Sequence, residues 1–191
     1  RIDEDKYVWL DKFTIRNLEL ISAQQEGGVP LIDILDHTVT PMGSRQLRKW
    51  IILPLKDKVA IDERLHIVNR FFKDESFADT IREPLKQIAD LERLISKVAV
   101  NRINPREMLQ LKRSLKCIVP IREALKGEAS PELQKMADQL HPCEFLLEKI
   151  EHELREDVSI AINQGGLIKE GIDAELDDLL KISFSGKDYL L

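Results

Sequence analysis

The fold is decided by residues 104–127, which read NPREMLQLKRSLKCIVPIREALKG. Asn104 and Glu107, with a proline directly after the first of them, stand in the order of a helix capping box, so a helix is predicted to begin here. Pro120 removes one backbone hydrogen bond inside this helix and predicts a kink. Gly127 predicts its end, because glycine commonly terminates helices.

Apolar and basic residues of this helix are predicted to occupy opposite faces. At helical spacing the basic side chains of Lys112, Arg113 and Lys116 fall away from the apolar ones. The apolar sector contains Met108, Leu111, Leu115, Ile118, Val119, Ile121 and Leu125. The sequence therefore predicts one face in a hydrophobic core and one basic face.

The remainder of the chain repeats the helical pattern outward from this segment. Aromatic residues make up only 5% of the sequence and β-branched runs are few, which also favours helices over strands. Helices are predicted for 31–35, from 41 to the Pro54 stop, after Asp57 with Ile61, Leu65, Val68 and Phe72 on one face, after Pro84 with Leu85 to Val98, from 131 to 140, for 145–154, and from Asp173 onward. The predicted fold class is mainly α, a multi-helix bundle.

Two short segments read as strands. Lys6–Leu10 and Phe13–Ile15 are rich in aromatic and β-branched residues, and 158–162 alternates apolar with small residues before a Gly-Gly turn. One or two short strands are therefore expected, near the N-terminus and near residues 158–162.

Composition limits the class of protein. The 191 residues are 43% hydrophobic and 33% charged, which is typical of a globular chain. The longest apolar run, 50–53, ends at Pro54 and is far too short for a membrane span. Cys117 and Cys143 lack C-x-x-C spacing, which favours a reduced intracellular chain with two buried thiols, although spacing alone leaves a single disulfide open.

Charge is distributed unevenly along the chain. The net charge is −5, yet segment 93–126 has nine basic and two acidic residues, whereas 127–191 has fifteen acidic and six basic residues. A basic block can mark a nucleic-acid or acidic partner. It can equally belong to helices of complementary charge or to a surface that docks a neighbouring domain.

Motifs for catalysis and metal binding are incomplete. Gly166 and Gly171 match the spacing of a phosphate-binding loop, but Ile172 and Asp173 stand where its Lys and hydroxyl residue belong. Asp33, Asp36 and His37 form the best metal-like group, with a single imidazole, so capping and surface roles are favoured. We therefore expect no catalytic, cofactor-binding or metal-ligating residue in this chain.

The candidate site residues are basic. Arg106, Lys112, Arg113 and Lys116 have the charge needed to contact phosphate oxygens. Because interleaved aromatic residues are missing and the whole chain is acidic, a solvated or domain-docking face is favoured over nucleic acid. The same interpretation applies to Arg45, Arg48 and Lys49.

An ordered set of short motifs resembles a known family. The chain is similar to the core of bacterial MutS, a family of DNA mismatch-recognition ATPases, over nearly its entire length. The motifs that carry the resemblance are Trp9-Leu10-Asp11, Thr14 with Arg16 to Leu20, Leu35 to Arg45, Asp90-Leu91-Glu92-Arg93-Leu94, Asn104-Pro105-Arg106-Glu107, Gly165 to Ile168, and Glu175-Leu176-Asp177.

The resemblance implies a fragment of a longer protein. Residues 1–12 would end a linker and form a first strand, 13–171 would be the first half of the core or lever domain, and 172–191 would begin the helix that leads into the DNA clamp. Such a core couples the ATPase to the clamp. The alternatives are a free-standing helical interaction scaffold and a hydrolase whose site is assembled from distant residues.

The resemblance also implies cofactors and partners, all of them belonging to the parent protein. ATP and Mg²⁺ would bind outside this segment. The partners would be mismatched duplex DNA, the ATPase, connector and clamp domains of the same chain, a second copy in a homodimer, and a MutL-like protein. The parent would be cytoplasmic and associated with the nucleoid.

Overall fold

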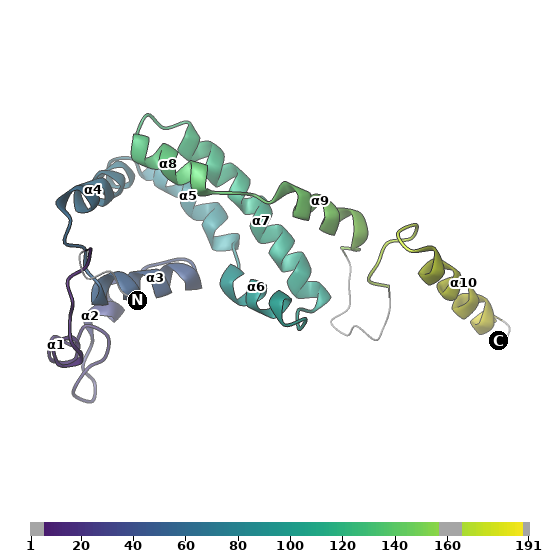
Figure 1. Ribbon diagram of the computed structural model, residues 1–191, viewed down its shortest axis with the longest axis horizontal. Helices are drawn as coiled ribbons and strands as arrows, with labels where there is room; N and C mark the ends of the chain where they lie inside the picture. The colour runs from purple at the N-terminus through teal and green to yellow at the C-terminus, as the bar shows by residue number, and fades with distance from the viewer. Residues whose placement is uncertain (1–5, 157–165, 189–191) are drawn as a thin grey trace.

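The computed structural model describes residues 6–156 and 166–188, and within these ranges the chain is helical (Figure 1). The helices are α1 (Lys12–Asn17), α2 (Leu31–Leu35), α3 (Pro41–Ile52), α4 (Lys58–Lys73), α5 (Glu75–Gln87), α6 (Leu91–Ala99), α7 (Pro105–Lys126), α8 (Pro131–Gln139), α9 (Glu144–Glu153) and α10 (Ala174–Asp188). The described residues contain no sheet, only two isolated antiparallel bridges, Tyr7 with Leu55 and Leu154 with Ile168. The mainly α class is confirmed.

Short polar side chains begin most of these helices. Asn104 accepts the backbone N–H of Glu107 at 2.9 Å while Glu107 accepts the N–H of Asn104 at 3.1 Å, which confirms the predicted capping box of α7. Single caps of the same kind precede other helices and come from Asp11, Thr40, Asp57, Asp74, Asp90, Ser130 and Asp173. Each cap satisfies a backbone donor that has no partner inside its helix.

Helix α7 is the centre of the bundle because both hydrophobic clusters depend on it. The first cluster joins α5, α7 and α8, and its buried residues are Phe77, Ile81, Ile88, Ile121, Leu125, Leu133 and Ala137. The second joins α6, α7 and α9 through Leu94, Leu111, Leu115 and Leu147. At 22 residues α7 is about 33 Å long, so one helix spans both clusters.

Polar contacts attach neighbouring segments to α7 and to the turn that follows it. Ser114 is fully buried, and its hydroxyl accepts the N–H of Ala89 at 3.0 Å and donates to the carbonyl of Gln110 at 2.8 Å. The hydrogen bond from Ala89 to Ser114 attaches the turn between α5 and α6 to the middle of α7. Arg70 of α4 forms a two-bond fork with Glu128, which attaches α4 to the turn between α7 and α8.

The predicted N-terminal strand is wrong. Residues 13–15 lie in α1, because Asp11 accepts the N–H of Thr14 at 2.7 Å and starts a helix there. Only one bridge forms upstream, where Val8 donates its N–H to the carbonyl of Pro54 at 2.8 Å. The second predicted strand, near 158–162, lies outside the described residues.

The helices between 57 and 99 differ from the prediction in two ways. Pro84 lies inside α5 instead of starting a helix. Helix α5 ends before Ile88, and Asp90 then caps the start of a separate helix, α6. The helix after Asp57 forms as predicted, but Phe72 on its apolar stripe is 87% exposed, because α4 packs on the core through Ile67 and Phe71 instead. Spacing alone did not identify which side of the helix is covered.

Helix α10 lies beyond α9, at the opposite end of the molecule from α4 (Figure 1). The segment before it is attached to the end of α9, where Arg155 donates its N–H to Leu167 and Lys169 donates its N–H to Glu153. Neither hydrophobic cluster includes a side chain from the described part of α10, residues 174–183. No helix in the described part of the chain is long and apolar enough to cross a membrane.

Candidate nucleic-acid or docking interface

The four candidate residues of α7 differ in their surroundings. Arg106, in the first turn, and Arg113 have exposed side chains. Lys116 is half-exposed at 51% of its side chain, whereas Lys112 is buried at 5%. The predicted basic face is therefore not uniformly at the surface. The prediction that Lys112 lies on an exposed face is wrong, because α9 and the residues after it cover that part of α7.

The buried side chain of Lys112 pairs with carboxylates at the surface. Its Nζ lies 2.8 Å from Oε1 of Glu156 and 3.8 Å from Oε1 of Glu151. The Glu156 side chain is 77% exposed, so the bond holds the lysine charge at the edge of the bundle. The hydrogen bond from Lys112 lowers the pKa of Glu156 below its usual range.

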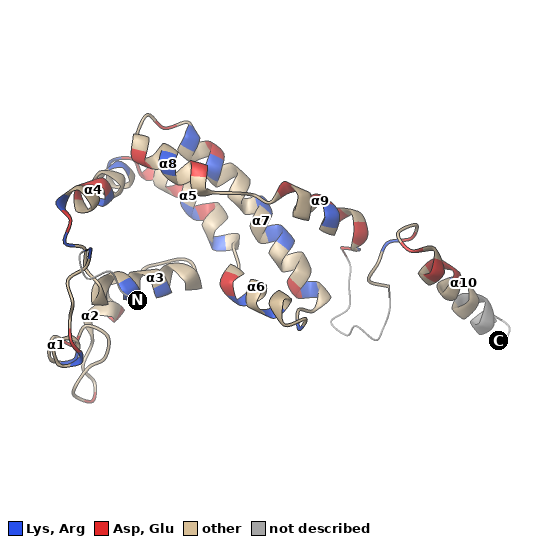
Figure 2. Ribbon diagram, viewed as in Figure 1, with Lys and Arg blue, Asp and Glu red and all other residues tan. Residues whose placement is uncertain are grey.

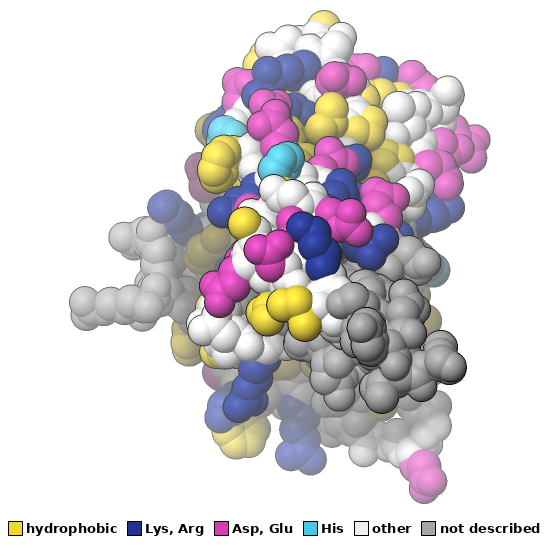
Figure 3. Space-filling view, turned by 90° about the vertical axis from the view of Figure 1, so that its right-hand side faces the viewer, with side chains coloured by type: hydrophobic (Ala, Val, Ile, Leu, Met, Phe, Trp, Pro, Cys, Tyr) yellow, Lys and Arg dark blue, Asp and Glu magenta, His cyan; other side chains and the backbone are white. Residues whose placement is uncertain are grey.

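Lys116 is also bonded to α9. Its ammonium group donates to Glu151, and this bond lowers the pKa of that carboxyl. Lys112 and Lys116 of the basic block therefore pair with acids of the acidic block, which is the complementary-helix arrangement that the charge pattern allowed. Basic residues of α7 lie opposite acidic residues of α9 (Figure 2), and on the face in Figure 3 the two signs intermingle.

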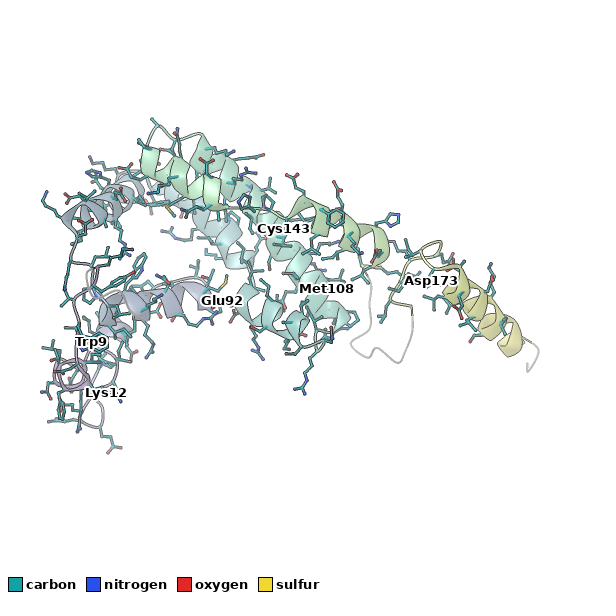
Figure 4. All side chains as sticks on the ribbon, in the orientation of Figure 1. Trp9, Lys12, Glu92, Met108, Cys143 and Asp173 are labelled. Carbon is teal, nitrogen blue, oxygen red and sulfur yellow. The ribbon has the colours of Figure 1, made fainter. Side chains whose placement is uncertain are left out.

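The cluster in α3 is also paired with acids. Arg45 donates to both Asp90 and Glu92 at the start of α6, at distances between 2.6 and 2.9 Å. These bonds raise the pKa of Arg45 and lower that of Asp90. Figure 4 shows Glu92 at the end of α6 that faces α3. Sequence reasoning missed this contact, because nothing local signals a pairing across 45 residues.

The metal-like group organises a turn. Asp36 accepts the N–H of Thr38 at 3.1 Å and the Thr38 hydroxyl at 2.6 Å, and it also accepts the hydroxyl of Ser44. The Ser44 bond, followed by those from Thr38, lowers the pKa of Asp36. Within 6–156 and 166–188, no group of three or more His, Cys, Asp and Glu side chains is arranged to hold a metal ion.

The two glycines that resemble a phosphate loop shape the turn before α10. Gly166 and Gly171 have φ angles of +69° and +84°, the region that glycine adopts without strain. The N–H of Gly171 donates to Asp177 at 2.8 Å, and Asp173 accepts the N–H of Leu176. The backbone amide of Gly171 is therefore bonded to a carboxylate of α10.

One basic residue outside these groups was missed. Arg122 of α7 has its Nε buried without a hydrogen-bond partner, beside a hollow lined by the loop between α8 and α9. Nothing in the sequence around Arg122 distinguishes it from the other arginines, so its lack of a partner at Nε is visible only in the structure.

Comparisons with known proteins identify the family. Residues 13–185 match the family model for MutS domain III. The chain is similar to proteins named DNA mismatch repair protein MutS, with 56% identity to that of Cytophaga hutchinsonii, 49% to that of Bacteroides fragilis and 46% to that of Porphyromonas gingivalis. Each comparison covers all of this chain but only 21 to 22% of the relative, so the chain spans about a fifth of the length of these curated relatives. The chain belongs to the MutS domain III family.

Proposed function

We propose that this chain is the structural and mechanical core, or lever, of a MutS-like mismatch-recognition protein, and that it couples an ATPase to a DNA clamp. One observation carries the proposal: α7 alone contributes buried residues to both hydrophobic clusters. A displacement applied to one cluster is therefore carried to the other by a continuous helix.

The packing suits a rigid transmitter. Ile118 and Leu91 contact both clusters, so the two are joined by side chains as well as by the α7 backbone. Close-packed interiors resist gradual deformation and move between discrete arrangements. The ion pairs from Lys112 and Lys116 to the α9 side add contacts that move with α7.

The other functions belong to the parent protein in this proposal. Mismatched duplex DNA, ATP and Mg²⁺ bind to parts of the longer chain outside these 191 residues, and the segment itself is not an enzyme. A homodimer, a MutL-like partner, and the connector, clamp and ATPase domains of the same chain complete the list of partners. A cytoplasmic location near the nucleoid follows from such a role.

The basic residues of α7 are assigned to docking within the protein before DNA. Lys112 and Lys116 already bond to carboxylates, and a phosphate would have to displace those bonds. Arg106 and Arg113 are exposed, and they are the candidates for weak phosphate contact.

The experiment uses a hybrid protein in which these residues replace the matching segment of the Cytophaga hutchinsonii MutS. Lys116, between Leu115 of one cluster and Ile121 of the other, is changed to glycine to soften α7 at the point where the clusters meet. ATP hydrolysis, affinity for mismatched DNA, and the change of that affinity with nucleotide are measured separately. We expect the first two to persist and the nucleotide-dependent change to fall about fivefold or more.

Two control variants separate softening from other effects. Lys116→Ala removes the bond to Glu151 but keeps a strong helix former, and Glu123→Gly softens α7 inside the first cluster only. Each glycine costs the helix about 1 kcal/mol relative to alanine, so the two glycine variants are matched in stability. If Lys116→Gly leaves the nucleotide-dependent change intact, or if Glu123→Gly reduces it equally, the coupling proposal is wrong.

A further inference from the structure

A surface hollow of about 520 Å³ lies between α7 and the loop that joins α8 to α9. Its lining is Arg122, His141, Pro142, Cys143, Glu144, Phe145 and Leu146. Figure 4 labels Cys143, which lies in the α8–α9 connection directly before α9. The hollow is not part of either hydrophobic cluster or of the basic residues described above.

Arg122 is the unusual residue of this hollow. Its Nε is buried and has no hydrogen-bond partner in the described part of the chain. A buried donor without a partner is costly, and a guanidinium group is best satisfied by a carboxylate that accepts two parallel bonds. Arg45 and Arg70, by contrast, each form a fork with a carboxylate of this chain. Glu144 lines the same hollow and forms no ion pair with Arg122 among the described residues.

The rim of the hollow is apolar and exposed. Phe145 is 79% exposed and Leu146 is 38% exposed, both in the first turn of α9. Cys143, which precedes them, has a φ angle of +55° and gives no side-chain cap to α9. Non-glycine residues reach this backbone region at a cost, and the helix that follows brings Phe145 to the same hollow as Arg122.

We propose that this hollow is a docking site for a protein segment that presents a carboxylate next to an apolar side chain, with the carboxylate on Arg122 and the apolar side chain against Phe145. The charge of Arg122 and the exposed apolar rim together define this occupant. The segment comes from the rest of a MutS-length chain, because relatives such as the Cytophaga hutchinsonii MutS carry most of their length outside the match. The proposal does not depend on the coupling role.

Cys143 supplies a readout inside the site. It is an exposed free thiol in the isolated chain, and Cys117, whose thiol pKa is raised by burial, serves as an internal reference. The rate of N-ethylmaleimide addition at each cysteine is followed by peptide mass mapping. We expect addition at Cys143 to be about tenfold slower in the hybrid MutS than in the isolated chain, because the docked segment covers the thiol.

Variants test the two halves of the site. In the hybrid, Arg122→Met and Phe145→Ser should each restore fast addition at Cys143, and Arg122→Lys should restore it in part, because lysine lacks the fork. Phe145 is exposed, so its replacement leaves the fold intact. Lys135→Met, an exposed cation on α8 outside the hollow, is the matched control and should leave the hybrid protected.

Two results would overturn the proposal. One is an equal rate of addition at Cys143 in the isolated chain and in the hybrid. The other is protection in the hybrid that survives Arg122→Met, which would remove the carboxylate from the site. Arg122→Met in the isolated chain should leave the rate unchanged, and a rise there would show a local effect of the substitution instead of undocking. Loss of coupling in Lys116→Gly leaves all of these rates unaffected, so the two proposals fail separately.

Discussion

The guanidinium of Arg45 donates two parallel hydrogen bonds to the carboxylate of Asp90, from Nη1 to Oδ2 at 2.9 Å and from Nη2 to Oδ1 at 2.7 Å. The same carboxylate accepts the N–H of Arg93 at 3.2 Å as the cap of α6. One side chain therefore starts a helix and holds α3 against it. Met42 is the partly buried α3 residue that packs on the first cluster, so this ion pair is a main attachment of α3 to the bundle.

Removing the charge of Asp90 should loosen that attachment. Asp90→Asn keeps the size of the side chain but weakens both the fork and the cap, so the melting temperature should fall. Asp62→Asn is the matched control, since Asp62 forms an exposed i,i+4 pair with Lys58 that contributes little. The melting temperatures of both variants are measured by circular dichroism. Equal melting temperatures for the two variants would contradict the assigned role of Asp90.

Acid should weaken the fold through several carboxyls at once. Folding lowers the pKa of Asp90 from its ordinary value of 3.8, through the Arg45 bond first, and lowers that of Glu107 from 4.5, through the Lys97 bond first. A depressed folded pKa means that the stabilisation is present above the unfolded value and disappears as pH falls through the folded value. Stability should therefore be steady above about pH 5 and decline below about pH 4.

The test is urea unfolding at a series of pH values. The decline should be shallower in Asp90→Asn, because that variant has already lost one of the titrating groups. A stability that rises as pH falls below 4 would show that these carboxyls are not held ionised by the fold.

The local signals in the sequence predicted most of the helices. The capping box at Asn104 and the caps at Thr40, Asp57 and Ser130 act within three residues, so their pattern can be read directly. The strand predicted at Phe13–Ile15 was wrong because strand propensity needs a partner, whereas the Asp11 cap acts alone.

The contacts between helices could not be predicted in the same way. Lys112 looks like a surface lysine on a helical wheel, and only the packing of α9 against α7 shows that it is buried. Arg45 and Asp90 are 45 residues apart, and no periodicity links them. Which exposed stripe is covered, as for Phe72 on α4, depends on the packing of whole helices.

Leu133 should be among the most costly core positions to truncate. Its side chain is fully buried in the first cluster, between α7 and α8. Leu133→Ala should lower the free energy of unfolding by about 2–5 kcal/mol, because a cavity remains. Met136→Ala, on the same helix but 42% exposed, should change it by about 1 kcal/mol or less. Urea denaturation measures both, and similar losses would contradict the assigned core.

DNA binding by the isolated chain should be weak and independent of mismatches. Two of the four candidate cations, Lys112 and Lys116, are bonded to glutamates, so few charges remain for phosphates. The logarithm of affinity should fall against the logarithm of salt with a slope of about 2 or less. Arg113→Ala should reduce that slope by about 1, whereas Lys112→Met should leave it unchanged.

Fluorescence anisotropy with matched and mismatched duplexes is the measurement, after circular dichroism shows that each variant is helical. A preference for the mismatched duplex at physiological salt would contradict the proposal that other parts of the parent protein recognise the mismatch.

Helix α10 should be the least protected helix of comparable length in the isolated chain. Leu179 and Ile182 are 58% and 66% exposed, so each forgoes a large part of the about 1.5–3 kcal/mol that full burial of such a side chain supplies. Its N-terminal turn is fixed by Asp173 and by the bond from Gly171 to Asp177, but a helix of 15 residues whose described side chains belong to neither hydrophobic cluster gains little stability from packing. Amides of 176–183 should therefore exchange with deuterium orders of magnitude faster than those of 109–125 in α7.

The comparison is made on a dilute sample shown to be monomeric, with Leu179→Ser as a control that should not change the rates. Protection that appears only at high concentration and is lost in Leu179→Ser would mean that a second copy covers the stripe. Strong protection in the dilute monomer would mean that α10 is stable without a partner, and the exposed stripe would then no longer indicate a missing contact.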